Sequence, residues 1–113
     1  MDKLFVYGTL CPGQPNHHLL ENIGGTWEKG IVRGILYPEG WGAALGYPAM
    51  ILDEKGGIVE GYLFSSDNLM MHWDDLDAFE GEGYERVRTD VELENKSIVE
   101  AFVYTLRPLS ESK

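Results

Sequence analysis

One stretch in the second half of the chain places its apolar residues at helical spacing. Leu69, Trp73 and Leu76 stand four and three positions apart, which is the spacing of one face of an α-helix. The next position on that face belongs to Glu80 and not to Phe79. At about 100° per residue, Glu80 lies roughly 20° from Leu69 around the helix axis. The pattern therefore predicts a helix whose apolar face contains a carboxylate.

The predicted helix has recognisable ends. Ser66 or Asp67 is suited to cap its start, and Gly81 is suited to end it. Glu80 is then the last helical residue, where the helix dipole disfavours a negative charge. A carboxylate is unfavourable both on an apolar face and at a helix C-terminus. Its presence here indicates a functional residue with a raised pKa. The alternative is that the helix ends earlier and that Glu80 points to water.

Shorter apolar runs between glycine, proline or charged turns predict the strands. They cover residues 4–7, 26–37, 49–52, 58–64, 85–93 and 98–106, and a short helix capped by Asn16 covers 16–23. Two glycines in 26–37 indicate a long or bulged strand, and the turn at 53–57 is typical of a hairpin. We interpret 38–48, which includes Trp41, as a loop. Strands this short and numerous tend to form barrels, so the predicted fold class is α+β, a small mixed, mostly antiparallel β-barrel with flanking helices.

Length and composition favour one small domain. The chain has 113 residues, a formal net charge of −10 and a single cysteine, Cys11. We expect residues 1–109 to form one domain, residues 110–113 to be a flexible tail, and the chain to be a monomer or weak homodimer. The charge argues against a nucleic-acid partner. No apolar run approaches the length of a membrane span, and the N-terminus does not resemble a signal peptide, so we expect a cytoplasmic protein without a membrane partner.

The segment Tyr7, Gly8, Thr9 and Leu10 is the second candidate for chemistry. An apolar strand that stops at a glycine leaves consecutive backbone N–H groups without strand partners, and glycine permits the φ > 0 geometry that lets such groups converge on an anion. The alternative is a strand end followed by a plain turn.

Other polar residues carry weaker signals. The histidines and the cysteine do not have the spacing of metal ligands, so we expect neither a metal nor another cofactor; these residues are His17, His18, His72 and Cys11. On other faces of the predicted helix three aspartates are most simply a solvated acidic surface: Asp74, Asp75 and Asp77.

Several segments together resemble the γ-glutamylcyclotransferase-like superfamily, which includes the AIG2-like proteins. The matching segments are FVYGTL (5–10), GYPA (46–49), VEGYLF (59–64), LDAFEG (76–81), YER (84–86) and AFVY (101–104). They span nearly the whole chain in the order of the family. The resemblance implies a small mixed barrel with helices on its flanks, which agrees with the strand count above.

The resemblance also implies roles for residues. The loop of Tyr7, Gly8, Thr9 and Leu10 would bind the γ-glutamyl part of the substrate, and Glu80 would act as general acid and base. Tyr84 and Tyr104, core residues by default, are weaker candidates for hydrogen bonds in the pocket. Cys11 departs from the family pattern, since an arginine is frequent at its position.

The implied reaction cyclises a γ-glutamyl amine or γ-glutamyl amino acid to 5-oxoproline and releases the amine, without a cofactor. The chain would then be a transferase or amidine-type lyase with an unassigned small-molecule γ-glutamyl substrate. Two alternatives stay open. One is a non-catalytic γ-glutamyl or small-molecule binding or regulatory protein on the same scaffold. The other is a different enzyme on this scaffold, such as one that removes a γ-glutamyl protecting group.

Overall fold

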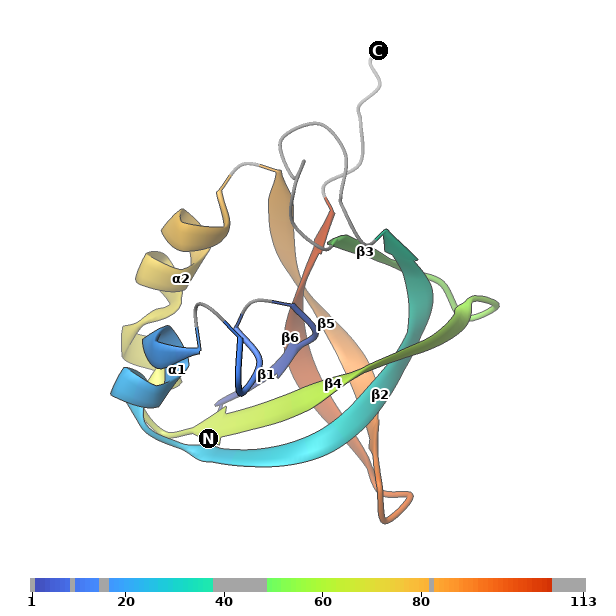
Figure 1. The fold of residues 1–113 in the computed structure, drawn as a ribbon, viewed down its shortest axis with the longest axis horizontal. Coiled ribbons are helices and arrows are strands. Elements are labelled where there is room, and N and C mark those ends of the chain that lie inside the picture. Colours follow the sequence, from blue (N-terminus) through green and yellow to red (C-terminus); the bar gives the residue numbers. More distant parts are fainter. Residues whose placement is uncertain (1, 9, 15–16, 38–48, 82, 107–113) are drawn as a thin grey trace.

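The computed structural model describes residues 2–8, 10–14, 17–37, 49–81 and 83–106 (Figure 1). In chain order, these residues form β1 (Asp2–Val6), α1 (His18–Ile23), β2 (Thr26–Tyr37), β3 (Ala49–Leu52), β4 (Gly57–Ser66), the 3₁₀ turn η2 (Leu69–Met71), α2 (Trp73–Glu80), β5 (Tyr84–Leu93) and β6 (Ile98–Leu106). The predicted loop at 38–48 with Trp41, and the predicted tail at 110–113, lie outside this part of the chain, so the proposed domain limits stay a prediction. Neither α-helix of the described residues is long and apolar enough to cross a bilayer.

The strands close into a barrel, as the sequence predicted. The hydrogen-bonded order is β3-β2-β4-β1-β6-β5, and a further pairing of β2 with β5 joins Gly30 to Leu93 and Ile31 to Glu92. The pairing of β1 with β6 is parallel, while the other pairings are antiparallel. Figure 1 shows the strands wrapped around one another, with both helices on one flank. The α+β prediction of a mixed, mostly antiparallel barrel with flanking helices is confirmed.

The two faces of the sheet are packed against different partners. Along β1 successive side chains alternate between the faces: Leu4 and Val6 belong to one buried cluster, and Phe5 belongs to another. The first cluster includes the helical residues Leu20 and Leu76, so we call it the helix-side core. The second, which we call the barrel core, is drawn from strands: Phe5, Val32, Met50, Val59, Leu63, Val91, Leu93, Ala101 and Val103.

The long strand β2 is regular, which excludes the bulge that its glycines suggested. Its register with β4 runs without interruption from Thr26 opposite Ser65 to Gly34 opposite Gly57. At Gly30 an added Cβ would lie 2.8 Å from Cγ1 of Val91. The glycine therefore serves the close approach of β5, where the barrel closes, and not a bulge.

The hairpin predicted around residues 53–57 is wrong. A turn is present, since the Gly56 N–H donates to the Asp53 carbonyl at 2.8 Å. However, β3 and β4 both pair with β2, and their registers meet at Gly34. The predicted turn is therefore present, but β2 is long enough to pair with both flanking strands.

The single predicted helix is divided into η2 and α2. The Ser66 hydroxyl accepts the Asn68 N–H at 3.0 Å and donates to the Gly24 carbonyl. The Asn68 side chain also donates to the Ile23 carbonyl, at 3.0 Å. These bonds to the end of α1 hold a 3₁₀ turn, and α2 begins only at Trp73, after His72. Ser66 therefore caps a turn, and tertiary hydrogen bonds override the continuous helix. The first helix begins at His18 rather than at 16; Asn16 lies outside the described residues.

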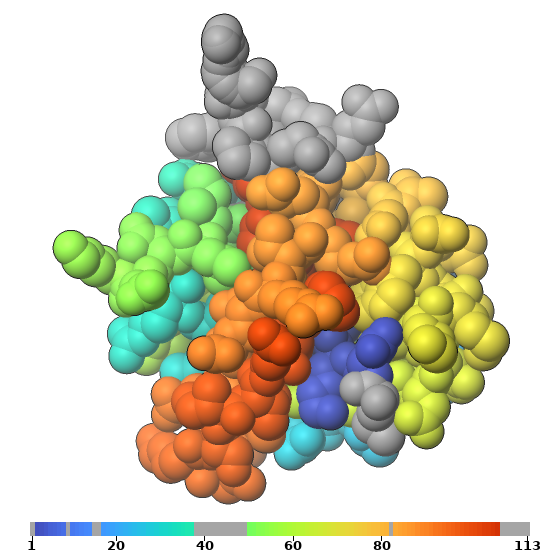
Figure 2. Space-filling model, turned by 180° about the vertical axis from the view of Figure 1, so that it is seen from behind, coloured from blue at the N-terminus to red at the C-terminus, as the bar shows by residue number. Residues whose placement is uncertain are grey.

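Seen from behind, β5 and β6 cover the centre of the molecule, and η2 and α2 form one flank (Figure 2). The end of α2 leads directly into the start of β5. The predicted helix end and the following strand are therefore close in space as well as in sequence.

Candidate active site

Glu80 ends α2 on the buried side of the helix. Gly81 follows with φ 83°, and its N–H donates to the Asp77 carbonyl at 3.0 Å, which is a favourable use of glycine at a helix end. Glu80 is half-buried, whereas the neighbouring Phe79 is 44% exposed. The periodicity that assigned Glu80 and not Phe79 to the inner face is confirmed, and the alternative of a Glu80 that points to water is excluded.

Burial changes the protonation of this carboxyl. It raises the pKa of Glu80 from 4.5 to about 7, because the charged form loses hydration. Near neutral pH the group is therefore present in both protonation states. A carboxyl with such a pKa is suited both to accept and to donate a proton.

Three tyrosines gather around Glu80 from the ends of different strands. Burial raises the pKa of Tyr7 far above its ordinary value, and the nearby Tyr84 and Glu80 raise it further. Glu80 also contributes to the raised pKa of Tyr104, after burial and Asp77. The Tyr7 hydroxyl donates to the Tyr104 carbonyl at 2.6 Å. The structure therefore brings these four predicted residues together, where β1, α2, β5 and β6 meet.

The turn after β1 packs against this cluster through Leu10. The Cys11 N–H donates to the Gly8 carbonyl at 3.0 Å, which closes the turn. The Leu10 side chain is 4% exposed and belongs to the helix-side core together with Tyr84 and Tyr104. Leu10 is thus a core residue whose side chain anchors the turn. Thr9 lies outside the described residues.

The Asp77 side chain is 43% exposed, as a solvated acidic surface predicts, but it also makes two specific contacts. Its Oδ1 accepts the Tyr104 hydroxyl at 2.6 Å, and its Oδ2 lies 3.6 Å from Nη2 of Arg86. The position of Asp77, three residues before Glu80, was a usable signal that the two share a side of the helix. Arg86 had no comparable signal, because its contact with α2 depends on the three-dimensional arrangement of β5.

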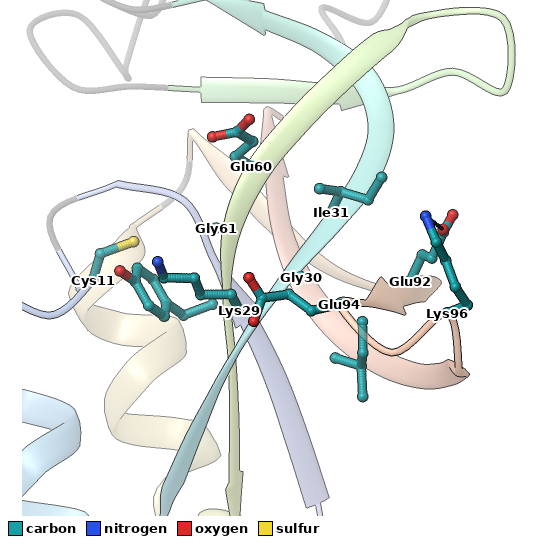
Figure 3. Close-up of a pocket in the computed structure, with 11 residues that line it drawn as sticks. Cys11, Lys29, Gly30, Ile31, Glu60, Gly61, Glu92, Glu94 and Lys96 are labelled. Atoms are coloured by element: carbon teal, nitrogen blue, oxygen red, sulfur yellow. Dashed lines mark ion pairs between the residues drawn. The ribbon is translucent and has the colours of Figure 1, made fainter.

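A separate cavity of about 550 Å³ lies over β2 and β4 (Figure 3). Its lining includes Cys11, Lys29, Glu60 and the turn between β5 and β6. Lys96 of that turn pairs with Glu92 of β5 at 3.9 Å. Its described lining includes neither Glu80 nor the three tyrosines. Burial raises the pKa of the Cys11 thiol to about 11, so the thiol is protonated at neutral pH and poorly suited to act as a nucleophile.

The described residues offer no metal centre. No three of their histidine, cysteine, aspartate and glutamate side chains are grouped so that they would hold a metal ion.

Comparison with known protein families assigns this chain to one of them. The family model described as "Gamma-glutamyl cyclotransferase, AIG2-like" matches residues 4–113. The chain belongs to this family. The resemblance inferred from the sequence is confirmed.

Named relatives agree with the assignment to the γ-glutamyl cyclotransferase, AIG2-like family. The chain is 35% identical to the γ-glutamylaminecyclotransferase of Bos taurus in an alignment 111 residues long that covers 90% of this chain and 64% of the bovine protein. It is 37% identical over 93 residues to the putative γ-glutamylcyclotransferase YkqA of Bacillus subtilis, which covers 78% of this chain and 31% of that protein. The chain thus spans less than two thirds of the length of either relative.

Solved structures share the fold. The crystal structure of Bacillus subtilis YkqA superimposes with a TM-score of 0.71 at 30% identity, over 93% of this chain and 35% of that one. An AIG2-like protein of Mus musculus gives a TM-score of 0.67 at 27% identity, over 93% of this chain and 76% of that one. The barrel with its flanking helices is therefore a shared scaffold of the family.

Proposed function

We propose that this chain cyclises a γ-glutamyl amine or γ-glutamyl amino acid to 5-oxoproline and releases the amine. The observation that carries the proposal is the half-buried Glu80 beside Tyr7, Tyr84 and Tyr104, with its pKa raised to about 7. Membership of the γ-glutamyl cyclotransferase, AIG2-like family supports the reaction class. The proposed reaction needs a group that first accepts and then donates a proton, and a carboxyl with this pKa is suited to both steps.

The proposed reaction takes place within the substrate. The α-amine attacks the γ-carbonyl carbon, a carbon–nitrogen bond closes the five-membered ring, and the bond to the departing nitrogen breaks. The α-ammonium loses one proton before attack, and the ring nitrogen loses a second as the lactam forms. The departing nitrogen gains one proton as its bond breaks and a second from solvent as it becomes an ammonium, so the overall proton count is unchanged. Glu80 takes the first proton as carboxylate and delivers it as carboxylic acid. The protein also holds the substrate in the folded shape that cyclisation requires.

Backbone N–H groups of the turn after β1 are proposed to bind the anionic part of the substrate. Two positions for that anion are chemically reasonable, the α-carboxylate and the oxyanion that develops at the γ-carbonyl. A substrate analogue without the α-carboxylate distinguishes them. A rise in KM with little change in kcat indicates α-carboxylate binding, whereas a similar KM indicates that the N–H groups act on the oxyanion.

The name of the bovine relative, γ-glutamylaminecyclotransferase, favours a γ-glutamylamine as substrate. We therefore propose incubation of the purified chain with three substrates: γ-glutamyl-lysine linked through the side-chain amine, a γ-glutamyl amino acid, and glutathione. Release of 5-oxoproline is the readout, and the first substrate is expected to give the highest kcat/KM.

A Glu80→Gln variant is the matched control, because it keeps the size of the side chain and removes its ability to exchange protons. Thermal stabilisation of the parent by these compounds without 5-oxoproline release would favour the binding or regulatory alternative. Release of free glutamate instead of 5-oxoproline would indicate a hydrolase on the same scaffold.

A further inference from the structure

Asp77 links the last turn of α2 to the sheet. It accepts a hydrogen bond from the Tyr104 hydroxyl at 2.6 Å and pairs with Arg86 at 3.6 Å. Side chains three positions apart on a helix lie on neighbouring parts of its surface. The contacts of Asp77 therefore fix the same turn that carries Glu80.

This link matters because α2 has little else to hold it. The helix has eight residues, and Leu76 is its fully buried side chain. A helix this short is unstable alone, so tertiary contacts determine its position. Its first turn is held by Trp73, whose Nε1 donates to Asp2 at 2.8 Å. The contact of Asp77 is the corresponding link at the Glu80 end.

Arg86 is held in a way that stability alone does not explain. Its guanidinium carbon lies 4.4 Å from the centre of the Trp73 ring and 5.2 Å from that of Phe102. Its Nη1 is buried and makes no hydrogen bond within the described part of the chain. An unpaired buried donor is destabilising. The two aromatic rings and the ion pair together fix the guanidinium beside Asp77 and so orient that carboxylate.

We propose that Asp77, fixed by Tyr104 and Arg86, is a positioning residue that holds the Glu80 carboxyl among the three tyrosines. The proposal rests on the proposed function for its kinetic consequences, but its structural consequence is independent of turnover. Asp77 itself is engaged by the sheet, so its action on the reaction would pass through Glu80.

The electrostatic consequence has a definite sign. Glu80 interacts electrostatically with Tyr7 and Tyr104; Tyr84 lies near Tyr7, and Asp77 and Arg86 act on Tyr104. An Asp77→Asn substitution removes a negative charge and leaves the Arg86 cation uncompensated, and a loosened helix end lets water reach Glu80. Each change favours the charged carboxylate. The pKa of Glu80 is therefore expected to fall.

The experiment compares the parent with Asp77→Asn in two measurements. The first follows the ¹³C resonance of the Glu80 carboxyl by NMR from about pH 4 to about pH 9. We expect its pKa to fall by about half a unit or more in the variant. The second measures kinetics on the substrate with the highest turnover. We expect kcat to fall about 10- to 100-fold, with KM changed less than about threefold.

Three further variants make the test specific. Asp74→Asn removes an exposed charge from the same helix, and Asp2→Ala removes the link at the far end; both are expected to leave the Glu80 pKa unchanged. Tyr104→Phe removes the hydroxyl that holds Asp77 and is expected to lower kcat as Asp77→Asn does. This variant keeps the test available if Asp77→Asn fails to fold.

The two proposals fail in different ways. An unchanged Glu80 resonance and pKa in Asp77→Asn would overturn the positioning role, whether or not the parent is active. A parent that releases no 5-oxoproline but shows the expected pKa change would overturn the proposed function alone. A fall in kcat that only follows the folded fraction, with no change in the Glu80 pKa, would also contradict positioning.

Discussion

The barrel core and the helix-side core are both well buried, but they bury different chemistry. The barrel core consists of aliphatic and other apolar side chains, such as Phe5, Met50 and Val103. The helix-side core includes Cys11, Tyr84 and Tyr104, and Tyr104 connects it to Asp77 and Arg86. Burying polar groups is unfavourable unless each is paired. The barrel core therefore contributes mainly to packing, whereas the helix-side core buries polar groups that lower stability and are suited to chemistry.

The position of Glu80 strengthens this contrast. A carboxyl whose pKa is raised by burial destabilises the folded chain whenever it is ionised. No comparable cost is found among the described residues of the barrel core, which are apolar. If the two regions divide stability and function between them, substitutions in the barrel core should affect mainly stability, and substitutions around Glu80 mainly turnover.

The largest effect is expected from Glu80→Gln. The amide cannot exchange protons with the substrate, so kcat for 5-oxoproline release is expected to fall about 10³-fold or more. The fold should persist, since the side chains are nearly equal in size. Circular dichroism and a turnover assay check the two statements together. Turnover at the parent rate by a folded variant would show that Glu80 is not the proton-transfer group.

A similarly large effect on stability is expected in the barrel core. Phe5 is 1% exposed, and Phe5→Ala removes a buried ring and leaves a cavity. The free energy of unfolding is expected to fall by about 3–5 kcal/mol, measured by urea denaturation. Ile58→Ala is the matched surface control, because Ile58 is 55% exposed; it should change the free energy of unfolding by less than about 1 kcal/mol. Equal effects of the two substitutions would contradict the assignment of the barrel core.

The sequence predicted the elements that depend on local pattern. The regular spacing of Leu69, Trp73 and Leu76 placed Glu80 on the inner face, and the runs at 26–37 and 98–106 gave strands with the observed limits. These features follow from side-chain periodicity, which is a property of neighbouring residues. The division of the predicted helix could not be read in this way, because it depends on hydrogen bonds from Ser66 and Asn68 to a distant helix end.

The candidate site was only partly predictable for the same reason. Tyr7, Tyr84 and Tyr104 entered the prediction because family resemblance or residue type marked them. Asp77 and Arg86 were missed, because their pairing requires α2 to lie against β5 and β6. The residues next to an aspartate on a helix surface do not indicate that a tyrosine from a distant strand donates a hydrogen bond to it.

A smaller effect is expected in the pH dependence of stability. The pKa of Glu80 is 4.5 when fully hydrated and about 7 in the folded chain, so the folded state binds more protons between these values. The contribution of Glu80 to stability is therefore present at acidic pH and is lost as pH rises toward 7. Allowing for partial exposure, the free energy of unfolding of Glu80→Gln, relative to that of the parent, should rise by roughly 1–3 kcal/mol between pH 4 and pH 8.

Urea denaturation of both proteins across this pH range provides the measurement. The difference between the two unfolding free energies, rather than either value alone, isolates Glu80 from the other titrating groups. A difference that stays constant with pH would mean that the carboxyl is hydrated in the folded chain, and the contrast between the two cores would lose its main support.

The smallest effect is expected at Ser66, a buried polar residue at the end of β4, just before η2. Ser66→Ala removes the hydroxyl that joins Asn68 to Gly24, so the free energy of unfolding should fall by about 1–2 kcal/mol. Because these contacts hold α1 and η2 and do not include Glu80 or its tyrosines, kcat per folded molecule should stay within about twofold of the parent. Combined urea denaturation and turnover measurements test this pair of expectations. If Ser66→Ala reduced kcat as strongly as Asp77→Asn, then the whole helix-side layer, and not the Asp77 link, would control the position of Glu80.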